Sequence, residues 1–239
     1  MKLTLTETEI MNISHVSLND WGVFDRDSYV ISTPEKSIIF IQKLKNPLDD
    51  TIVIPSIRNF IYLVKKVFVT KKKKQKDLSE ISFEVDDKRI IIEDENSKFF
   101  FYIGYKTLAE DILDVRTKLE EAIELEEKIK KVAQFRLPQE KRKDLIFAMS
   151  ASKISEIMFL SDNDKVIAQI RRDNELYFET IINTIDSKNQ EFNFKLSLDA
   201  IKNLLDIEYV VNVYFSEKLN TFITEFKKDN VKYFIASLV

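Results

Sequence analysis

The sequence predicts an α+β protein of two similar domains, each with antiparallel sheets packed against two short helices. Three observations lead to this prediction. Many short segments alternate apolar and polar residues, only four short segments have helical spacing, and the order of these elements in the first half recurs in the second.

The expected strands are clearest where every second residue is apolar. Phe192, Phe194 and Leu196 fall on one face of such a segment, and Asn193 and Lys195 fall on the other, which is typical of a half-buried antiparallel strand. Short polar stretches separate the segments, as hairpin connections do. The other expected strands are residues 37–43, 50–54, 81–85, 89–93, 98–105, 156–160, 165–172, 176–182, 209–216, 221–227 and 231–239.

Four helices are expected between these strands. The first begins at Thr6, which forms a capping box with Glu9. The second begins at Pro55, a residue suited to the first turn of a helix. The third covers residues 138–153 and the fourth begins at Ser197, and both continue with apolar residues at helical spacing.

The order of the elements suggests an internal duplication and hence two domains. We expect domain 1 at residues 1–106, a connector at 107–131 and domain 2 at 132–239. The connector is acidic and rich in helix-forming residues. It is either a solvated helical linker or a segment that partner proteins bind.

Composition argues against most enzyme classes. The chain of 239 residues has no cysteine, one histidine (His15) and two glycines (Gly22 and Gly104), so thiolate or histidine metal sites and glycine-rich phosphate loops are not expected. Carboxylates alone can support Mg²⁺-dependent nuclease chemistry, but the acidic pairs at 86–87 and 94–95 lie in expected turns. We therefore expect no enzyme activity, no cofactor and no bound metal.

Charge and hydropathy indicate a soluble intracellular protein. The net charge is −3, from 37 basic and 40 acidic residues, so nucleic-acid binding requires that the basic groups gather on one surface. No apolar run is long enough to span a bilayer, and the N-terminus lacks the apolar core of a signal peptide. We expect a cytoplasmic protein with no membrane partner.

Local similarity and element order together point to a known family. The segments that carry the similarity are residues 192–196 before a short helix, 209–214, 230–236, and the opening 1–3 with the helix after it. In these segments the sequence resembles the DNA-polymerase sliding clamps of tailed bacteriophages, which are related to proliferating-cell nuclear antigen.

The resemblance implies a processivity factor for DNA replication. Three subunits would close into a homotrimeric ring around double-stranded DNA, with the helices lining the hole and binding phosphates without regard to sequence. Peptides of the DNA polymerase and of the clamp loader would bind the ring, and a phage-encoded protein would work in the host cell cytoplasm.

The resemblance also implies which residues face DNA. The expected DNA-binding residues are the basic side chains of the second, third and fourth helices and of the lysine-rich run after the second: Arg58, Lys65, Lys66, Lys72, Lys73, Lys141, Arg142, Lys143, Lys153 and Lys202. The run at 71–76 is expected to be a loop, either merely solvated or in contact with phosphates at the rim of the ring. The first helix departs from the family pattern, since it carries Glu7 and Glu9 and no lysine.

The resemblance implies two further sites, a peptide-binding pocket and a subunit interface. A peptide pocket beneath the connector would use Leu108, Ile112, Leu113, Tyr233, Ile235 and Leu238. By the family order, residues 98–105 would pair edge to edge with residues 176–182 of the next subunit. That subunit interface would involve Phe99, Phe101, Ile103, Leu176, Phe178 and Thr180.

Two other functions are open at this stage. A β-rich trimeric virion component would have no basic stripe and no polymerase partner. A clamp-derived transcription or assembly factor would keep the fold without the hold on DNA, because fold does not fix function.

Overall fold

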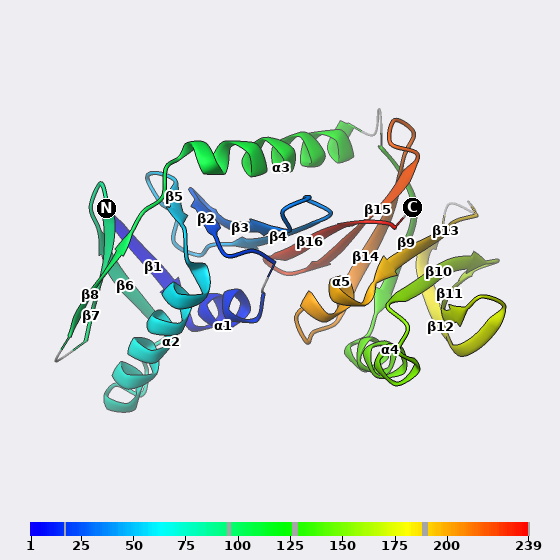
Figure 1. The fold of residues 1–239 in the computed structure, drawn as a ribbon, viewed down its shortest axis with the longest axis horizontal. Helices are drawn as coiled ribbons and strands as arrows, with labels where there is room; N and C mark the ends of the chain where they lie inside the picture. Colours follow the sequence, from blue (N-terminus) through cyan, green and yellow to red (C-terminus); the bar gives the residue numbers. More distant parts are fainter. Residues whose placement is uncertain (17, 95–96, 126–128, 188–190, 239) are drawn as a thin grey trace. The chain divides into compact units, whose positions relative to one another are not determined.

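The computed structural model describes residues 1–16, 18–94, 97–125, 129–187 and 191–238. The chain divides into two compact units, Met1–Arg116 and Thr117–Val239 (Figure 1). Helix α3 (Thr107–Leu125) contains the division. No helix in the described ranges has the length and apolar character needed to cross a membrane.

The first unit contains two antiparallel arrangements of strands, in the orders β1-β6-β7-β8 and β4-β3-β2-β5, and two helices. Its elements are β1 (Lys2–Thr6), α1 (Glu7–His15), β2 (Gly22–Asp25), β3 (Ser28–Ser32), β4 (Ile38–Lys43), β5 (Ile52–Ile54), α2 (Ile57–Lys74), β6 (Glu80–Val85), β7 (Arg89–Glu93) and β8 (Lys98–Tyr102).

The second unit is a single antiparallel run of strands in the order β13-β10-β11-β12-β9-β14-β15-β16, again with two helices. Its elements are β9 (Ile129–Leu137), α4 (Gln139–Ser152), β10 (Glu156–Asp162), β11 (Lys165–Arg172), β12 (Glu175–Ser187), β13 (Asn193–Ser197), α5 (Leu198–Asn203), β14 (Tyr209–Ser216), β15 (Thr221–Lys228) and β16 (Val231–Ala236).

The two units repeat the same order of elements: one strand, one helix, four strands, one helix and three strands. The strand pairing repeats as well, since β1-β6-β7-β8 corresponds to β9-β14-β15-β16 and β5-β2-β3-β4 corresponds to β13-β10-β11-β12. The predicted repetition of element order is therefore confirmed. The units differ in their second helix, which has 18 residues in α2 and 6 in α5.

The expected strands and helices are all present, with shifts at some ends. Strand β8 stops at Tyr102 rather than 105, and β16 stops at Ala236. Strands β2, β3 and β9 are not among the expected strands, and the first residues of β9 lie in the range expected for the connector. In β3 every residue is buried, so the strand shows no alternation of apolar and polar residues.

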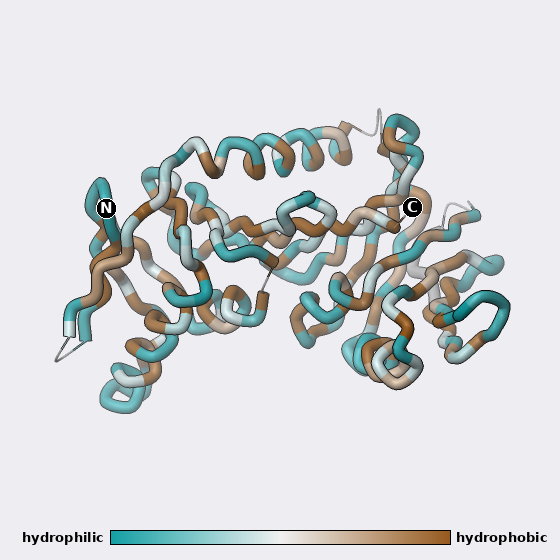
Figure 2. Tube along the Cα trace, in the orientation of Figure 1, coloured by the Kyte–Doolittle hydropathy of each residue, from teal (hydrophilic) through white to brown (hydrophobic). Residues whose placement is uncertain are grey.

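Aromatic side chains from several elements meet in the core of the first unit. Phe60 of α2 is fully buried, and its ring centroid lies 6.1 Å from that of Phe24, 6.5 Å from Phe83 and 5.5 Å from Phe101. These contacts fix α2 against strands β2, β6 and β8. Figure 2 shows the apolar positions inside each unit and the hydrophilic far end of α2.

Gly22 on β2 leaves room for the ring of Tyr29 on the neighbouring strand β3. A Cβ atom at Gly22 would stand 2.4 Å from Tyr29 Oη and 2.7 Å from its Cε2. Tyr29 is buried and packs on Phe24 and Phe40, with ring centroids 4.9 and 6.2 Å away, so its ring has little freedom to move.

We expect Gly22→Ala to lower the free energy of unfolding by about 2 kcal/mol, the usual cost of overpacking a core. Urea unfolding followed by circular dichroism measures the change. Gly104→Ala is the matched control, because its Cβ would meet no atom closer than 3.0 Å. An equal loss in both variants would contradict the proposed clash with Tyr29.

Candidate nucleic-acid interface

Helix α2 presents a continuous basic face. Its buried stripe is Ile57, Phe60, Ile61, Val64, Val67 and Phe68, so the other side of the helix faces solvent. The helix carries seven basic and no acidic side chains in its 18 residues. Arg58 and Lys66 are exposed and Lys65 is half-buried, and no ion pair to them is found in the described part of the chain. This face can attract phosphates without base readout.

The lysine-rich run belongs mostly to α2, so the expectation of a loop was wrong. Lys71, Lys72, Lys73 and Lys74 form the last turn of the helix, and only Gln75 and Lys76 follow it. Lysine is a good helix former, and cations are favourable near the C-terminal end of a helix dipole. The basic residues of α2 therefore extend from Arg58 to the end of the helix.

The acidic residues of α1 have partners within the first unit. Glu9 is buried, and its carboxylate accepts hydrogen bonds from the backbone N–H of Thr6 at 2.7 Å and of Lys45 at 2.7 Å. The predicted capping box between Thr6 and Glu9 is confirmed. Glu7 forms an ion pair with Lys72, whose Nζ also lies 5.6 Å from the centre of the Phe68 ring. The acidic helix thus serves the internal structure of this unit.

The basic triplet at the start of α4 is largely engaged inside the second unit. Lys141 Nζ donates to Thr180 Oγ1 at 2.8 Å, and Lys143 Nζ lies 3.0 Å from Asp206 Oδ2. The hydrogen bond from Lys143 holds the pKa of the Asp206 carboxyl below its usual range. Lys143 and Asp206 are both about half exposed, so this pair contributes little to stability.

Arg142 was expected to contact DNA, and the structure contradicts this. It is 4% exposed, and its Nη2 donates to the backbone carbonyls of Leu204 and of Lys202, the latter at 3.4 Å. Its Nη1 lies 3.3 Å from Asp206 Oδ1. Burial lowers the pKa of the guanidinium. Arg142 therefore joins α4 to the end of α5 rather than facing solvent.

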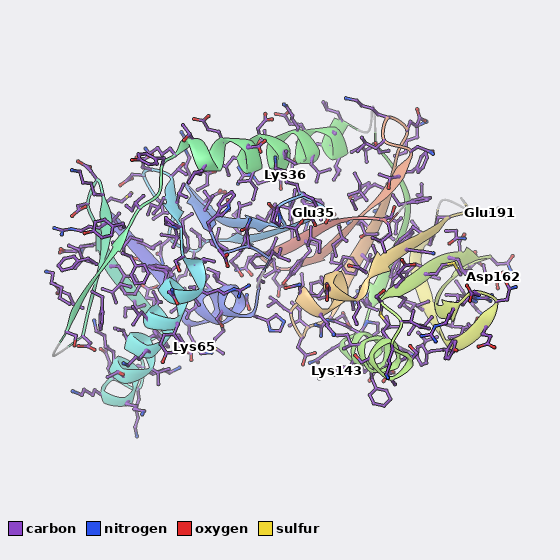
Figure 3. The ribbon with its side chains drawn as sticks, viewed as in Figure 1. Glu35, Lys36, Lys65, Lys143, Asp162 and Glu191 are labelled. Carbon is purple, nitrogen blue, oxygen red and sulfur yellow. The ribbon has the colours of Figure 1, made fainter. Side chains whose placement is uncertain are left out.

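The remaining expected cations of the second unit are exposed. Lys153 ends α4 in the left-handed conformation, with φ 55°, and Lys202 lies on α5. Figure 3 marks Lys65 on α2 and Lys143 on α4. In the described part of the chain, Arg58, Lys65 and Lys66 of α2 form the group of expected cations on one helix that have no ion pair.

The six residues expected to form a peptide pocket differ in exposure. Ile112 on α3 and Tyr233 and Ile235 on β16 are buried. Leu108 and Leu238 are exposed, and Leu113 is half-buried. Only these last three present apolar surface that a peptide can reach without repacking of the core.

Strands β8 and β12 have unpaired edges among the described residues. Strand β8 ends its sheet, and residues 175–183 of β12 pair only with β11. The expected interface residues Phe99, Phe101, Ile103 and Phe178 are half-buried, Thr180 is buried and Leu176 is exposed. The more exposed apolar side chains beside these edges, which the sequence reading missed, are Phe100, Tyr102, Tyr177 and Ile181.

Within the described ranges, no three His, Cys, Asp or Glu side chains are arranged to hold a metal ion.

Comparison with solved structures shows that the fold is that of the DNA sliding clamps, and the likeness extends over the whole chain. The DNA polymerase sliding clamp from Bacillus subtilis matches with a TM-score of 0.63 and 16% identity, over 100% of this chain and 65% of that chain. The PCNA2–PCNA3 complex from Sulfolobus tokodaii matches with a TM-score of 0.63 and 9% identity, over 99% of each chain. A Helicobacter pylori beta clamp bound to a DNA ligase peptide matches with a TM-score of 0.60 and 16% identity, over 100% of this chain and 65% of that one.

The chain thus spans 65% of the length of the Bacillus subtilis clamp. No protein-family model and no curated protein matches the sequence.

Proposed function

We propose that this protein is a DNA sliding clamp: a non-enzymatic, ring-forming protein that encircles duplex DNA and tethers a DNA polymerase. The observation that carries the proposal is the repeated element order of two units, together with the match over 99% of both chains to a clamp of the same length. A phage origin rests on the local sequence resemblance alone.

The unpaired strand edges support a closed ring. An exposed edge is a ready template for pairing with another chain, and β8 and β12 are such edges in different units of one chain. Pairing of β8 with β12 of a second copy is heterologous, so repeated pairing closes a ring when the rotation allows it. Three copies give a homotrimer of six units and 3 × 28.2 = 84.6 kDa.

The charge distribution supports binding to phosphates. The protein is acidic overall, yet α2 carries seven basic and no acidic side chains. Arg58, Lys65, Lys66, Lys73, Lys153 and Lys202 are proposed to contact the duplex, with Lys141, Lys143 and Lys72 as secondary contacts because each already has a partner. Such a surface binds DNA without sequence preference.

Partner peptides are the second part of the proposal. A Helicobacter pylori clamp binds a DNA ligase peptide, and we propose that this chain binds peptides of a polymerase and of a clamp loader in the same general way. The reachable apolar residues Leu108, Leu113 and Leu238 are the proposed contacts.

The ring is tested first by solution mass and by crosslinking. Because the chain has no cysteine, a variant with one cysteine in β8 (Tyr102→Cys) and one in β12 (Tyr177→Cys) can be joined only at these positions by a flexible bismaleimide. We expect light scattering to give a trimer and the crosslinker to give covalent trimers. Each single-cysteine variant should give no covalent trimer with the crosslinker.

The proposed encirclement of DNA is then tested by comparing circular with linearised duplex DNA. A crosslinked ring formed on circular duplex DNA should stay on the DNA in high salt, and it should leave after the DNA is linearised. A trimer without this topological hold would support a virion or assembly role instead. A chain that stays monomeric at all concentrations and gives no covalent trimer would contradict the proposed ring.

A further inference from the structure

The first unit contains a cavity between α1 and α2 whose apolar walls and exposed tyrosine have no role in the sliding-clamp proposal. Its volume is about 310 Å³, and Ile13 and Val16 from α1 and its C-cap, with Ile57 and Ile61 from α2, form apolar walls. This volume is at the lower end of the range for small-molecule pockets, about 300–1,000 Å³. It suits a group of the size of one nucleotide.

An exposed aromatic ring stands at this cavity. Tyr62 of α2 lines it and is 67% exposed. A single exposed apolar residue is ordinary on a protein surface. Here, however, the ring lies next to an apolar hollow, so a flat group that stacks on Tyr62 can bury its edge against the isoleucine side chains. Ser14 also lines the cavity; its hydroxyl donates to the carbonyl of Met11 at 2.8 Å and can still accept a hydrogen bond.

The charge around the cavity is complementary to phosphate. Arg58 and Lys65 line it together with Tyr62, and none of its lining residues is acidic. On α2 they stand four residues before and three residues after Tyr62, so all three side chains lie on one side of the helix. Figure 3 shows Lys65 on the part of α2 near α1.

We infer that this cavity is a binding site for one nucleotide of single-stranded DNA, with the base stacked on Tyr62 and the flanking phosphates held by Arg58 and Lys65. An aromatic platform flanked by cations is the usual arrangement for single strands. The bases of a duplex are stacked inside the helix and cannot reach Tyr62. The inference rests on the proposed function, since it assumes that α2 faces nucleic acid, and it adds a preference for unpaired nucleotides.

The first test measures the affinity of a fluorescent thymidine oligonucleotide and of a matched duplex by fluorescence anisotropy. Tyr62→Ala should weaken binding of the single strand about ten-fold, the range expected for one lost stacking contact, and should leave the duplex affinity unchanged. Tyr62→Phe should keep the affinity for the single strand. Tyr105→Ala is the control, because Tyr105 is an exposed tyrosine of the same unit, at 84%, that does not line the cavity.

The second test places a probe at the site. Trp21 is the only tryptophan of the chain, so a Trp21→Phe/Tyr62→Trp variant reports on this position alone. Its fluorescence should be quenched by the oligonucleotide over the concentration range seen by anisotropy, whereas a Trp21→Phe/Tyr105→Trp variant should show no quenching. Thermal unfolding checks that each variant is folded.

Three results would overturn the inference: no binding of the single strand by the unchanged protein, an equal loss of single-strand and duplex affinity in Tyr62→Ala, or no loss at all. Failure of the proposed function appears differently. In that case the protein shows no topological hold on circular duplex DNA, whatever the effect of Tyr62→Ala on the oligonucleotide.

Discussion

Replacing Arg142 by alanine is expected to lower the free energy of unfolding of the second unit by about 3 kcal/mol, because charged hydrogen bonds are lost and a cavity is left. Helix α5 has only 6 residues, too few to be stable without tertiary contacts. The guanidinium of Arg142 satisfies the carbonyls of Lys202 and Leu204, where α5 ends. Alanine removes these hydrogen bonds and opens a cavity between α4 and α5.

The same substitution at the neighbouring residue is the control. Lys143→Ala removes an equal charge from α4, but Lys143 is about half exposed and pairs with Asp206 at the surface, so its loss should cost less than about 0.5 kcal/mol. Arg142→Lys should fall between the two, because an ammonium cannot reach both carbonyls in the planar geometry of the guanidinium. Urea unfolding at neutral pH measures all three variants. Equal destabilisation by the Arg142 and Lys143 changes would exclude the capping role.

The burial of Arg142 could not be predicted from the sequence. In the sequence it is the middle of three basic residues, and nothing local separates it from Lys141 and Lys143. Its partners lie on α5 and the segment after it, about sixty residues further along the chain. Burial that depends on such distant residues has no signature in the local pattern.

Elements whose structure depends on residues close together in the chain could be predicted from the sequence. Strand β13 alternates cleanly, and α1 carries its own capping box, so both follow from residues close together in the chain. Strands β2 and β3 are buried on both faces and show no alternation. Helix α2 was ended too early, because its apolar stripe stops at Phe68 while the lysines continue the helix for another turn.

The basic face of α2 was only partly predictable. The expected phosphate contacts are the lysines and arginines of the second, third and fourth helices and of the lysine-rich run, because the sequence alone does not show which of them a carboxylate or carbonyl engages. Lys72, Lys141 and Lys143 prove to have partners, while Arg58, Lys65 and Lys66 face outward from one helix. These last three residues are therefore the strongest candidates for phosphate contacts.

We expect the triple substitution Arg58→Ala, Lys65→Ala and Lys66→Ala to weaken duplex binding by at least about a hundred-fold at low salt. Each phosphate contact releases about 0.9 counterions from B-DNA, so the slope of log affinity against log salt concentration should become shallower by about 2.7. The measurement is fluorescence anisotropy with a short duplex at several salt concentrations. The effect should be the same for duplexes of different sequence, because phosphate contacts carry no sequence information.

The control variant removes the same number of positive charges, but from lysines that already form ion pairs. Lys45, Lys106 and Lys130 form exposed ion pairs with Glu80, Asp50 and Glu217. Their triple alanine variant has the same net charge as the α2 variant, and we expect it to lose less than about ten-fold in affinity, since only the general field of the protein changes. If both variants lose affinity equally, net charge rather than the face of α2 governs DNA binding. If only the α2 variant loses affinity and salt dependence, this face is where the protein meets the duplex.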